Sequence, residues 1–298
     1  MDLHPYMEEL KQEVHEYLSF LKKGMYHVHE GQTENTVLNA MFYSLENGGK
    51  RLRPVLLLMV LDAFGIAREK GIEVACALEM IHTYSLIHDD LPAMDDDDLR
   101  RGVPTNHKVY GEAVAILAGD GLLTDAFEIM GHAKYLAADT KLQLVKMLAS
   151  AAGSDGMIKG QNLDMAAEGK SITLDELKQI HYAKTGRLIE FACCAAGFIA
   201  DVSEMVLHQL QLFSRHLGLA FQIQDDILDV CGDELLMGKT VGSDVVNGKS
   251  TYVSLLGLDG AKQMLDEQTQ MALVCLDDLS ADVGMLKALT LYVANREL

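Results

Sequence analysis

The spacing of hydrophobic residues predicts helices along almost the whole chain. Over residues 2–24, apolar side chains recur every three or four positions, as they do in a helix that buries one face. The same spacing predicts further helices over 33–46, 72–91, 107–134 and 139–165, and again from residue 251 to the end. A series of amphipathic helices without intervening strands indicates an all-α fold.

Short polar signals mark where some of these helices begin, end or bend. Thr173 and Glu176 have the spacing of a capping box, in which each side chain bonds to the backbone of the other residue at a helix start. The glycine pair at 48–49 predicts a helix end. Thr185 and Gly186 lie inside a predicted apolar helix and predict a kink there, which would leave the carbonyl of Lys184 facing a cavity.

The composition supports long helices in a single body. No proline follows Pro104, while alanine, leucine, methionine and glutamate are plentiful. Length alone would suggest about two domains, yet the helical pattern continues through the chain. We therefore expect one domain over 1–298, with an N-terminal helix within 1–30 and a flexible flap at 232–250, where glycine, aspartate and lysine are frequent.

Charge and cysteine content exclude several classes of protein. The formal net charge of −19 argues against binding to nucleic acid or to an anionic membrane surface. The five cysteines show no metal-ligand spacing and lie among apolar neighbours, which is typical of reduced core residues. The N-terminus has no signal-peptide pattern, and the longest apolar run, 191–200, is about half the ~20 residues that span a membrane. We expect a soluble cytoplasmic protein without stable membrane insertion.

A dense acidic cluster ends the helix predicted at 72–91. Asp89 and Asp90 are followed by four consecutive aspartates at 95–98. Carboxylates this close raise one another's pKa unless cations lie among them, and a divalent metal is the simplest such cation. Mg²⁺ takes one or two carboxylates and completes its shell with water and phosphate oxygens. Arg100 and Arg101 come next in the chain and would face the same phosphate.

A second acidic cluster follows helical apolar residues much later in the chain. Asp225 and Asp229 are one turn apart on a helix and share a face, and Gln222 joins them three residues before Asp225. Asp226 lies between them. The two acidic helix ends are therefore predicted to face each other.

The alternative is that these acids are ordinary solvated surface. An acidic run is often a loop or a set of helix caps, and for residues 95–98 alone that interpretation is as good as the functional one. Two separate Asp-Asp pairs on otherwise apolar helices favour the functional interpretation, because burying acid without a partner is costly.

A basic turn at 48–54 opens another predicted helix. Lys50, Arg53 and the backbone amides at the helix start would form an anion pocket; the alternative is an ordinary basic surface turn. His82 lies two turns before Asp89 on the same helical face. A lone histidine on an apolar helix is more often a core residue than a ligand, and this alignment favours a functional role.

The chain contains five motifs that resemble those of the trans-isoprenyl diphosphate synthases and follow one another as they do in that family. The similarity is closest to the bacterial farnesyl diphosphate synthases. It runs from about residue 35 to the C-terminus. The motifs are Gly48-Gly49-Lys50-x-x-Arg53-Pro54, Asp89-Asp90-x4-Asp95 with Arg100-Arg101, Lys184-Thr185, Phe221-Gln222-x-x-Asp225-Asp226-x-x-Asp229, and the downstream lysines. One Asp-rich motif would be weak support, whereas five in the family's order are specific.

The resemblance implies a single-domain isoprenoid-synthase helical bundle around a deep central cavity, usually a homodimer. It also implies three Mg²⁺ ions, with Mn²⁺ as the alternative metal. Asp89 and Asp95 would bind two ions and Asp225 the third. Asp90, Asp226 and Asp229 would support the metals indirectly.

The resemblance also assigns substrate contacts. The residues expected to hold the allylic diphosphate, such as dimethylallyl or geranyl diphosphate, are Arg100, Lys184, Lys239 and Lys249. Those expected to hold isopentenyl diphosphate are Lys50, Arg53, His82 and Arg101. Those expected to act in catalysis by facing the allylic cation are Thr185, Gln222 and the carbonyl of Lys184.

The chemistry of the residues agrees with these roles. Breaking an allylic carbon–oxygen bond leaves a cation and a multiply charged diphosphate, which metals and cationic side chains stabilise. No histidine or glutamate stands out as a base, so the departing diphosphate is expected to remove the proton. Water must be excluded so that the cation is not quenched to an alcohol, and this would be the purpose of the flap.

The family pattern also implies a fifteen-carbon product. Tyr84 and Ser85, five and four residues before Asp89, would set the chain length, together with the additional residues Pro92 and Ala93. Helix geometry places Tyr84 about 140° from Asp89 around the axis, so this role rests on the resemblance alone.

Four other functions compete with a farnesyl synthase. A geranylgeranyl diphosphate synthase would differ in product length, and a terpene cyclase would usually carry an Asn/Ser/Glu pattern at its second metal site. A His-Asp phosphohydrolase would leave the second acidic helix unused. An inactive partner subunit would be expected to lack an acidic motif, and both are present.

Overall fold

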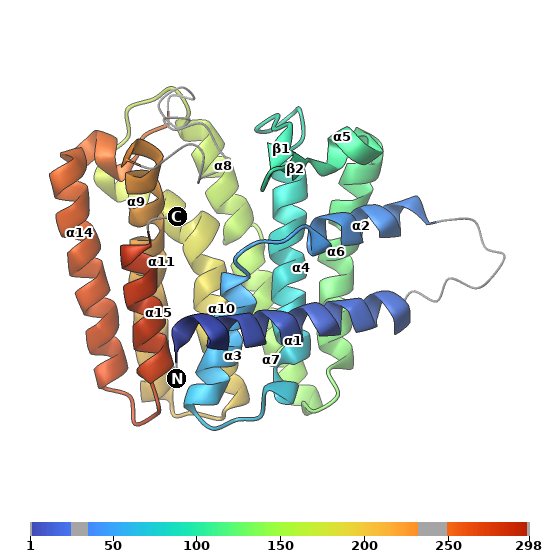
Figure 1. Ribbon diagram of the computed structural model, residues 1–298, viewed down its shortest axis with the longest axis horizontal. Coiled ribbons are helices and arrows are strands. Elements are labelled where there is room, and N and C mark those ends of the chain that lie inside the picture. The colour runs from blue at the N-terminus through green and yellow to red at the C-terminus, as the bar shows by residue number, and fades with distance from the viewer. Residues whose placement is uncertain (1, 25–34, 232–248, 297–298) are drawn as a thin grey trace. The chain divides into compact units, whose positions relative to one another are not determined.

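The computed structural model describes residues 2–24, 35–231 and 249–296, and these are almost entirely helical (Figure 1). The prediction of an all-α fold is confirmed. The chain divides into two compact units, which we call the N-terminal unit (2–58 and 67–145) and the C-terminal unit (59–66 and 146–298). Helices α3 (Leu52–Ala63) and α7 (Ala138–Ala152) run from one unit into the other.

The N-terminal unit is organised around α4 (Ile72–Asp89), which is buried on nearly every side. It packs against α1 (Leu3–Gly24), α2 (Thr36–Glu46) and α6 (Glu112–His132). The shorter elements are the 3-10 turn η1 (Arg68–Lys70), the antiparallel strands β1 (Leu99–Arg100) and β2 (Val103–Pro104), and α5 (Asn106–Tyr110). Among the described residues this hairpin is the only sheet, and it was not predicted.

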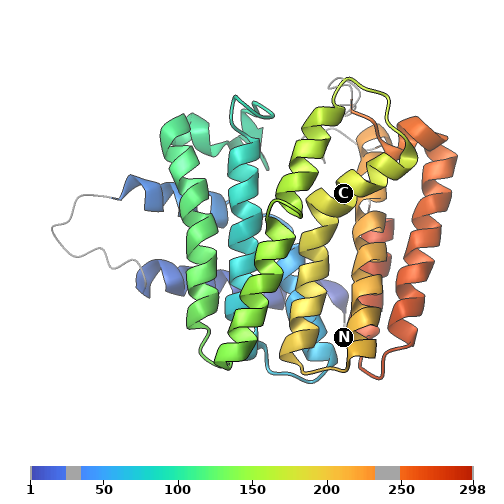
Figure 2. The same cartoon turned by 180° about the vertical axis from the view of Figure 1, so that it is seen from behind.

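The C-terminal unit is organised around the long helix α11 (Glu204–Cys231), which lies beside α14 (Tyr252–Asp277) in both views (Figures 1 and 2). Side chains from both helices, including Ile223 and Leu265, form a buried apolar cluster. The other elements are α8 (Met157–Ala167), α9 (Leu174–His181), η2 (Tyr182–Gly186), α10 (Arg187–Ile199) and α15 (Gly284–Asn295).

Two of the predicted long helices are each broken in two, so these predictions are wrong. The helix predicted at 107–134 is interrupted at Gly111, whose φ of 82° suits glycine. The helix predicted at 139–165 ends at Ala152 and resumes at Met157. A Cβ on Gly156 in that turn would lie closer than 3.0 Å to backbone atoms. Apolar spacing continues across such short breaks, so periodicity alone did not reveal them.

The signals at helix ends are better guides. In the capping box, Thr173 Oγ1 accepts from the backbone N–H of Glu176, whose carboxylate accepts from that of Thr173 at 2.8 Å. The predicted kink is one π-helical turn, η2. Helix α2 starts at Thr36 with Asn35 as its N-cap, and the residue proposed for that role, Thr33, lies outside the described residues.

None of the described helices combines the length and the apolar character that crossing a membrane would require.

Candidate active site

The first acidic cluster lies at the C-terminal end of α4, in the N-terminal unit. Asp89 is the last residue of the helix, and its carbonyl accepts from the backbone N–H of Asp95 at 2.8 Å. The loop between them therefore folds back and brings the two proposed metal ligands together at the backbone. Asp95 is exposed and Asp89 is half-buried, so both carboxylates are accessible from one end of α4.

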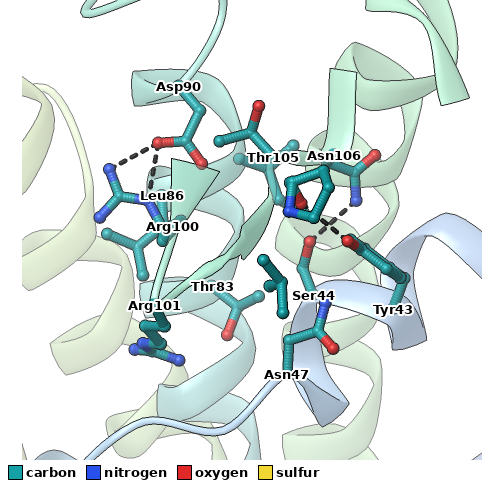
Figure 3. A pocket seen from close by; sticks show the side chains of 13 residues that line it. Tyr43, Ser44, Asn47, Thr83, Leu86, Asp90, Arg100, Arg101, Thr105 and Asn106 are labelled. Carbon is teal, nitrogen blue, oxygen red and sulfur yellow. Dashed lines mark hydrogen bonds and ion pairs between the residues drawn. The ribbon is translucent and has the colours of Figure 1, made fainter. Parts of the chain in front are cut away.

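Asp90 has a different environment from its two neighbours in the motif. Its side chain is buried and accepts from Arg100 Nε at 2.6 Å (Figure 3). Burial raises the pKa of Asp90, although Arg100 acts in the opposite direction. Arg100 also lies 3.4 Å from Asp97. The pair places the arginine that is proposed to hold the allylic diphosphate directly beside the acidic cluster.

Both arginines of this motif are carried by the short β hairpin, which is fastened to α2. Tyr43 Oη donates to the carbonyl of Pro104 at 2.7 Å, and Asn106 Nδ2 donates to Ser44 Oγ at 2.8 Å. A cavity of about 30 Å³ lies among these residues, Thr83 and the two arginines (Figure 3). The two hydrogen bonds join the hairpin and the residue at the start of α5 to α2.

The basic turn between α2 and α3 meets the same hairpin and α4. Arg101 Nη1 donates to the carbonyl of Gly48 at 2.5 Å. Arg53 Nη1 lies 3.2 Å from His82 Nε2 on α4. Burial lowers the pKa of His82 well below its usual value, and the nearby arginines lower it further. His82 is therefore neutral, and its Nε2 accepts from Arg53.

The four residues proposed to hold isopentenyl diphosphate therefore lie together. Lys50 and Arg53 belong to the turn, and His82 and Arg101 contact it. Arginine guanidinium groups and a neutral imidazole offer several donors to a diphosphate. The arrangement fits an anion site within the N-terminal unit.

The second acidic cluster lies near the end of α11, in the C-terminal unit. Asp225 has a side chain that is 41% exposed and forms an ion pair with Arg296. Asp226 and Asp229 are buried. Asp226 Oδ2 accepts from the backbone N–H of Tyr252 at 2.8 Å, which joins α11 to the start of α14. The most accessible of the three carboxylates is therefore the proposed metal ligand.

The π-helical turn brings the proposed catalytic residues of this unit together. Thr185 Oγ1 lies 3.4 Å from Gln222 Oε1, and Gln222 Nε2 lies 3.4 Å from Asp226 Oδ1. Lys184 Nζ forms an ion pair with Asp164 at 2.6 Å. Burial raises the pKa of Asp164, but Lys184 outweighs it and leaves that pKa below its usual value.

Sequence reasoning missed two residues at this cluster, Asp164 and Arg296. Asp164 holds Lys184, and Arg296 holds Asp225 while its guanidinium covers the ring of Phe221 at 4.1 Å. Each contact joins segments that are well separated in the chain, so no local spacing could have indicated it.

Most of the proposed flap lies outside the described residues. Lys239 lies outside the described residues, and of 232–250 only Lys249 and Ser250 are described, both half-buried. Their roles stay predictions.

The proposed chain-length residues lie on α4. Tyr84 is buried, with its ring 5.8 Å from that of His88 in an edge-on contact. Burial and the nearby Asp89 raise the pKa of Tyr84 to about 12. Ser85 Oγ donates to the carbonyl of His82 at 2.9 Å. Their effect on product length stays a prediction.

The described residues fit Mg²⁺ only with help from a substrate. Among them, no three histidine, cysteine or acidic side chains are grouped closely enough to hold a metal ion alone. Mg²⁺ is usually held by one or two carboxylates with phosphate oxygens and water, and Asp89, Asp95 and Asp225 offer such carboxylates. Asp89 and Asp225 belong to different units, and the proposal that they face each other stays a prediction.

Known proteins resemble this chain over most of its length. A family model described as polyprenyl synthetase matches residues 34–289. The farnesyl diphosphate synthase of Bacillus subtilis is 52% identical over 265 residues, which cover 88% of this chain and 90% of that protein.

Solved structures agree. The FPP/GFPP synthase of Zymomonas mobilis superposes with a TM-score of 0.87 at 35% identity, covering 98% of each chain. A geranyltransferase of Helicobacter pylori, complexed with magnesium and isoprenyl diphosphate, gives 0.82 at 35% identity and covers 98% of this chain and 97% of its own.

Proposed function

Because this chain belongs to the polyprenyl synthetase family, we propose that it condenses isopentenyl diphosphate head-to-tail with an allylic diphosphate. The allylic substrates are dimethylallyl and then geranyl diphosphate, and the products are farnesyl diphosphate and free diphosphate. The observation that carries the proposal is the partial exposure of Asp89, Asp95 and Asp225, whereas Asp90, Asp226 and Asp229 are buried.

Mg²⁺ held by these three aspartates would neutralise the charge that develops on the departing diphosphate. The protein is proposed to bind three ions, and the Mg²⁺ of the Helicobacter pylori relative supports the choice of metal. Two further groups of side chains are proposed to bind the substrates, one group for each diphosphate.

Arg100 and Lys184 hold the allylic diphosphate, joined by Lys239 and Lys249. Each contact between unit charges at 4 Å is worth about 4 kcal/mol at an effective dielectric near 20. Interactions that strengthen as the carbon–oxygen bond breaks lower the barrier. Lys184 forms an ion pair with Asp164. This pair would hold the ammonium group of Lys184 in place before the substrate binds.

Lys50, Arg53, His82 and Arg101 hold isopentenyl diphosphate. A neutral His82 adds no charge and keeps one ring nitrogen as a donor. Thr185 Oγ1, Gln222 Oε1 and the carbonyl of Lys184 turn electron-rich atoms toward the allylic cation. The double bond of isopentenyl diphosphate attacks that cation, and the departing diphosphate takes the proton.

We also propose a homodimer. Ile116 and Leu117 are large apolar residues on α6 with exposed side chains, and a second copy would cover them. Tyr84 and Ser85 are proposed to close the end of the product cavity after fifteen carbons.

The test is to incubate the pure protein with Mg²⁺, isopentenyl diphosphate and dimethylallyl diphosphate, and to size the products. A fifteen-carbon product that disappears with a metal chelator supports the proposal. A twenty-carbon product would make the chain a geranylgeranyl synthase. A cyclic hydrocarbon, or no product, would contradict prenyl transfer.

A further inference from the structure

The basic turn at 48–53 has an unusual backbone. Gly48, Gly49 and Arg51 have φ angles of 73°, 112° and 49°. Glycine adopts such angles without cost, but a residue with a Cβ does not. Arg51 must therefore be held in this conformation by its surroundings, and it lies between the two basic residues of the turn, Lys50 and Arg53.

A buried ion pair holds Arg51. Its Nη1 lies 2.5 Å from Glu79 Oε1 on α4, and its Nη2 donates to the carbonyl of Leu45 at the end of α2. The side chain of Glu79 is 2% exposed and that of Arg51 is 10% exposed. A buried pair of this kind loses much if one partner is removed, because the other charge is left buried and unpaired.

Two side chains of helix α4, about one helical turn apart, contact the basic turn. Glu79 contacts Arg51, and His82, one turn later, contacts Arg53 at 3.2 Å. Arg101 closes the other side of the turn, since a Cβ on Gly49 would lie closer than 3.0 Å to its guanidinium. The direction in which Lys50 and Arg53 leave the turn thus depends on the residue between them.

We propose that Glu79 and Arg51 are positioning residues for the isopentenyl diphosphate site. The pair fixes Arg51 in its left-handed conformation and so fixes the geometry of Lys50 and Arg53, without contacting the substrate itself. This inference rests on the proposed function, in which Lys50 and Arg53 bind that diphosphate.

Positioning and simple electrostatics predict opposite results for the loss of Glu79. Its carboxylate is a negative charge close to Arg51 in a site built for an anion. If it acted only through its charge, removing it would strengthen diphosphate binding. If it positions the turn, removing it weakens binding.

The test uses Glu79→Gln, with Glu73→Gln as the matched control. Glu73 is also a buried acid on α4, but its carboxylate accepts from the backbone N–H of Lys134. We expect the Kd for isopentenyl diphosphate, measured by calorimetry, to rise about tenfold in Glu79→Gln, equivalent to about 1.4 kcal/mol, and to stay unchanged in Glu73→Gln. An unchanged or lower Kd in Glu79→Gln, or equal losses in both variants, would overturn the inference.

A second test compares two variants that carry the same charge as each other. Arg51→Ala and Arg51→Gly both remove the guanidinium, but only glycine adopts a φ of 49° without cost. We expect Arg51→Gly to bind isopentenyl diphosphate more tightly than Arg51→Ala. Equal affinities would show that the backbone conformation does not matter.

Hydrogen exchange of the amides at 48–53 separates this inference from the proposed function. If the unaltered protein does not bind isopentenyl diphosphate, the proposed function and the positioning role both fail. If it binds, faster exchange in Glu79→Gln but not in Glu73→Gln supports positioning. Equal exchange rates in the two variants would contradict it.

Discussion

At the scale of single residues, the aspartates of each cluster are divided between two tasks. Asp90 and Asp226 are buried and bonded to Arg100 and to the backbone of Tyr252. Asp95 and Asp225 keep exposed carboxylates. Each cluster thus combines a buried aspartate that fixes the local structure with one whose carboxylate is exposed, and we propose the exposed ones as metal ligands.

Tyr84 offers a direct test of product length. Replacing it with alanine removes a buried ring from α4, and if that ring closes the product cavity the variant should make products longer than fifteen carbons. Products are sized by chromatography after removal of the diphosphate. Circular dichroism checks folding, because losing a buried aromatic ring costs about 3–5 kcal/mol. An unchanged fifteen-carbon product from the folded variant would remove Tyr84 from this role.

His181 predicts a dependence of stability on pH. Burial lowers the pKa of His181 to about 4, whereas an unfolded histidine has a pKa of about 6.5. The unfolded chain therefore binds more protons between these values, and stability falls as the pH drops below about 6.5. At pH 5.5 the loss from this residue should be about 1.4 kcal/mol relative to neutral pH.

Urea unfolding at pH 7.5 and 5.5 measures this contribution. The variant His181→Phe, which retains a ring beside Tyr252, should lose less stability at pH 5.5 than the unaltered protein. This substitution keeps the ring contact with Tyr252, so the two proteins differ mainly in the titratable imidazole. Identical pH dependence in His181→Phe and the unaltered protein would contradict a neutral His181 in the folded protein.

Residue types and spacings were enough to find the acidic clusters, because those signals are local. The aspartate and glutamine positions on α11 follow from helical periodicity. The partners of these residues do not. Arg296 reaches Asp225 and Asp164 reaches Lys184 only because distant helices pack together, and no pattern within one helix encodes that packing.

At the scale of elements, close contacts between helices depend on glycine. A Cβ on Gly160 of α8 would lie closer than 3.0 Å to the backbone nitrogen of Lys184 in the π-helical turn. The glycine allows α8 to approach the segment that carries Lys184 and Thr185. A kink at this turn could be predicted from sequence, but the helix that packs against it could not.

Gly160→Ala should therefore destabilise the protein. Overpacking against backbone costs about 1–3 kcal/mol, which urea unfolding would detect. Gly131→Ala on α6 is the control, since a Cβ there meets nothing within 4 Å and alanine favours a helix by up to about 1 kcal/mol. Equal stabilities for the two variants would mean that α8 can move away from the turn at no cost.

At the scale of the whole molecule, a chain with a net charge of −19 is proposed to bind two diphosphates. Cations are nevertheless present at both proposed diphosphate sites. Arg53 and Arg101 lie at the basic turn of the N-terminal unit, and Lys184 lies at the π-helical turn of the C-terminal unit. The all-α fold follows from periodicity, whereas the division into two units does not.

We propose that acidic residues of both units bind one diphosphate through Mg²⁺. The most direct measurement is a crystal structure with Mg²⁺, isopentenyl diphosphate and an unreactive sulfur analogue of geranyl diphosphate. We expect one diphosphate to be linked through metal ions to Asp89 and Asp95 and also to Asp225. Metal ions at only one acidic cluster, with Asp225 still paired to Arg296, would contradict it.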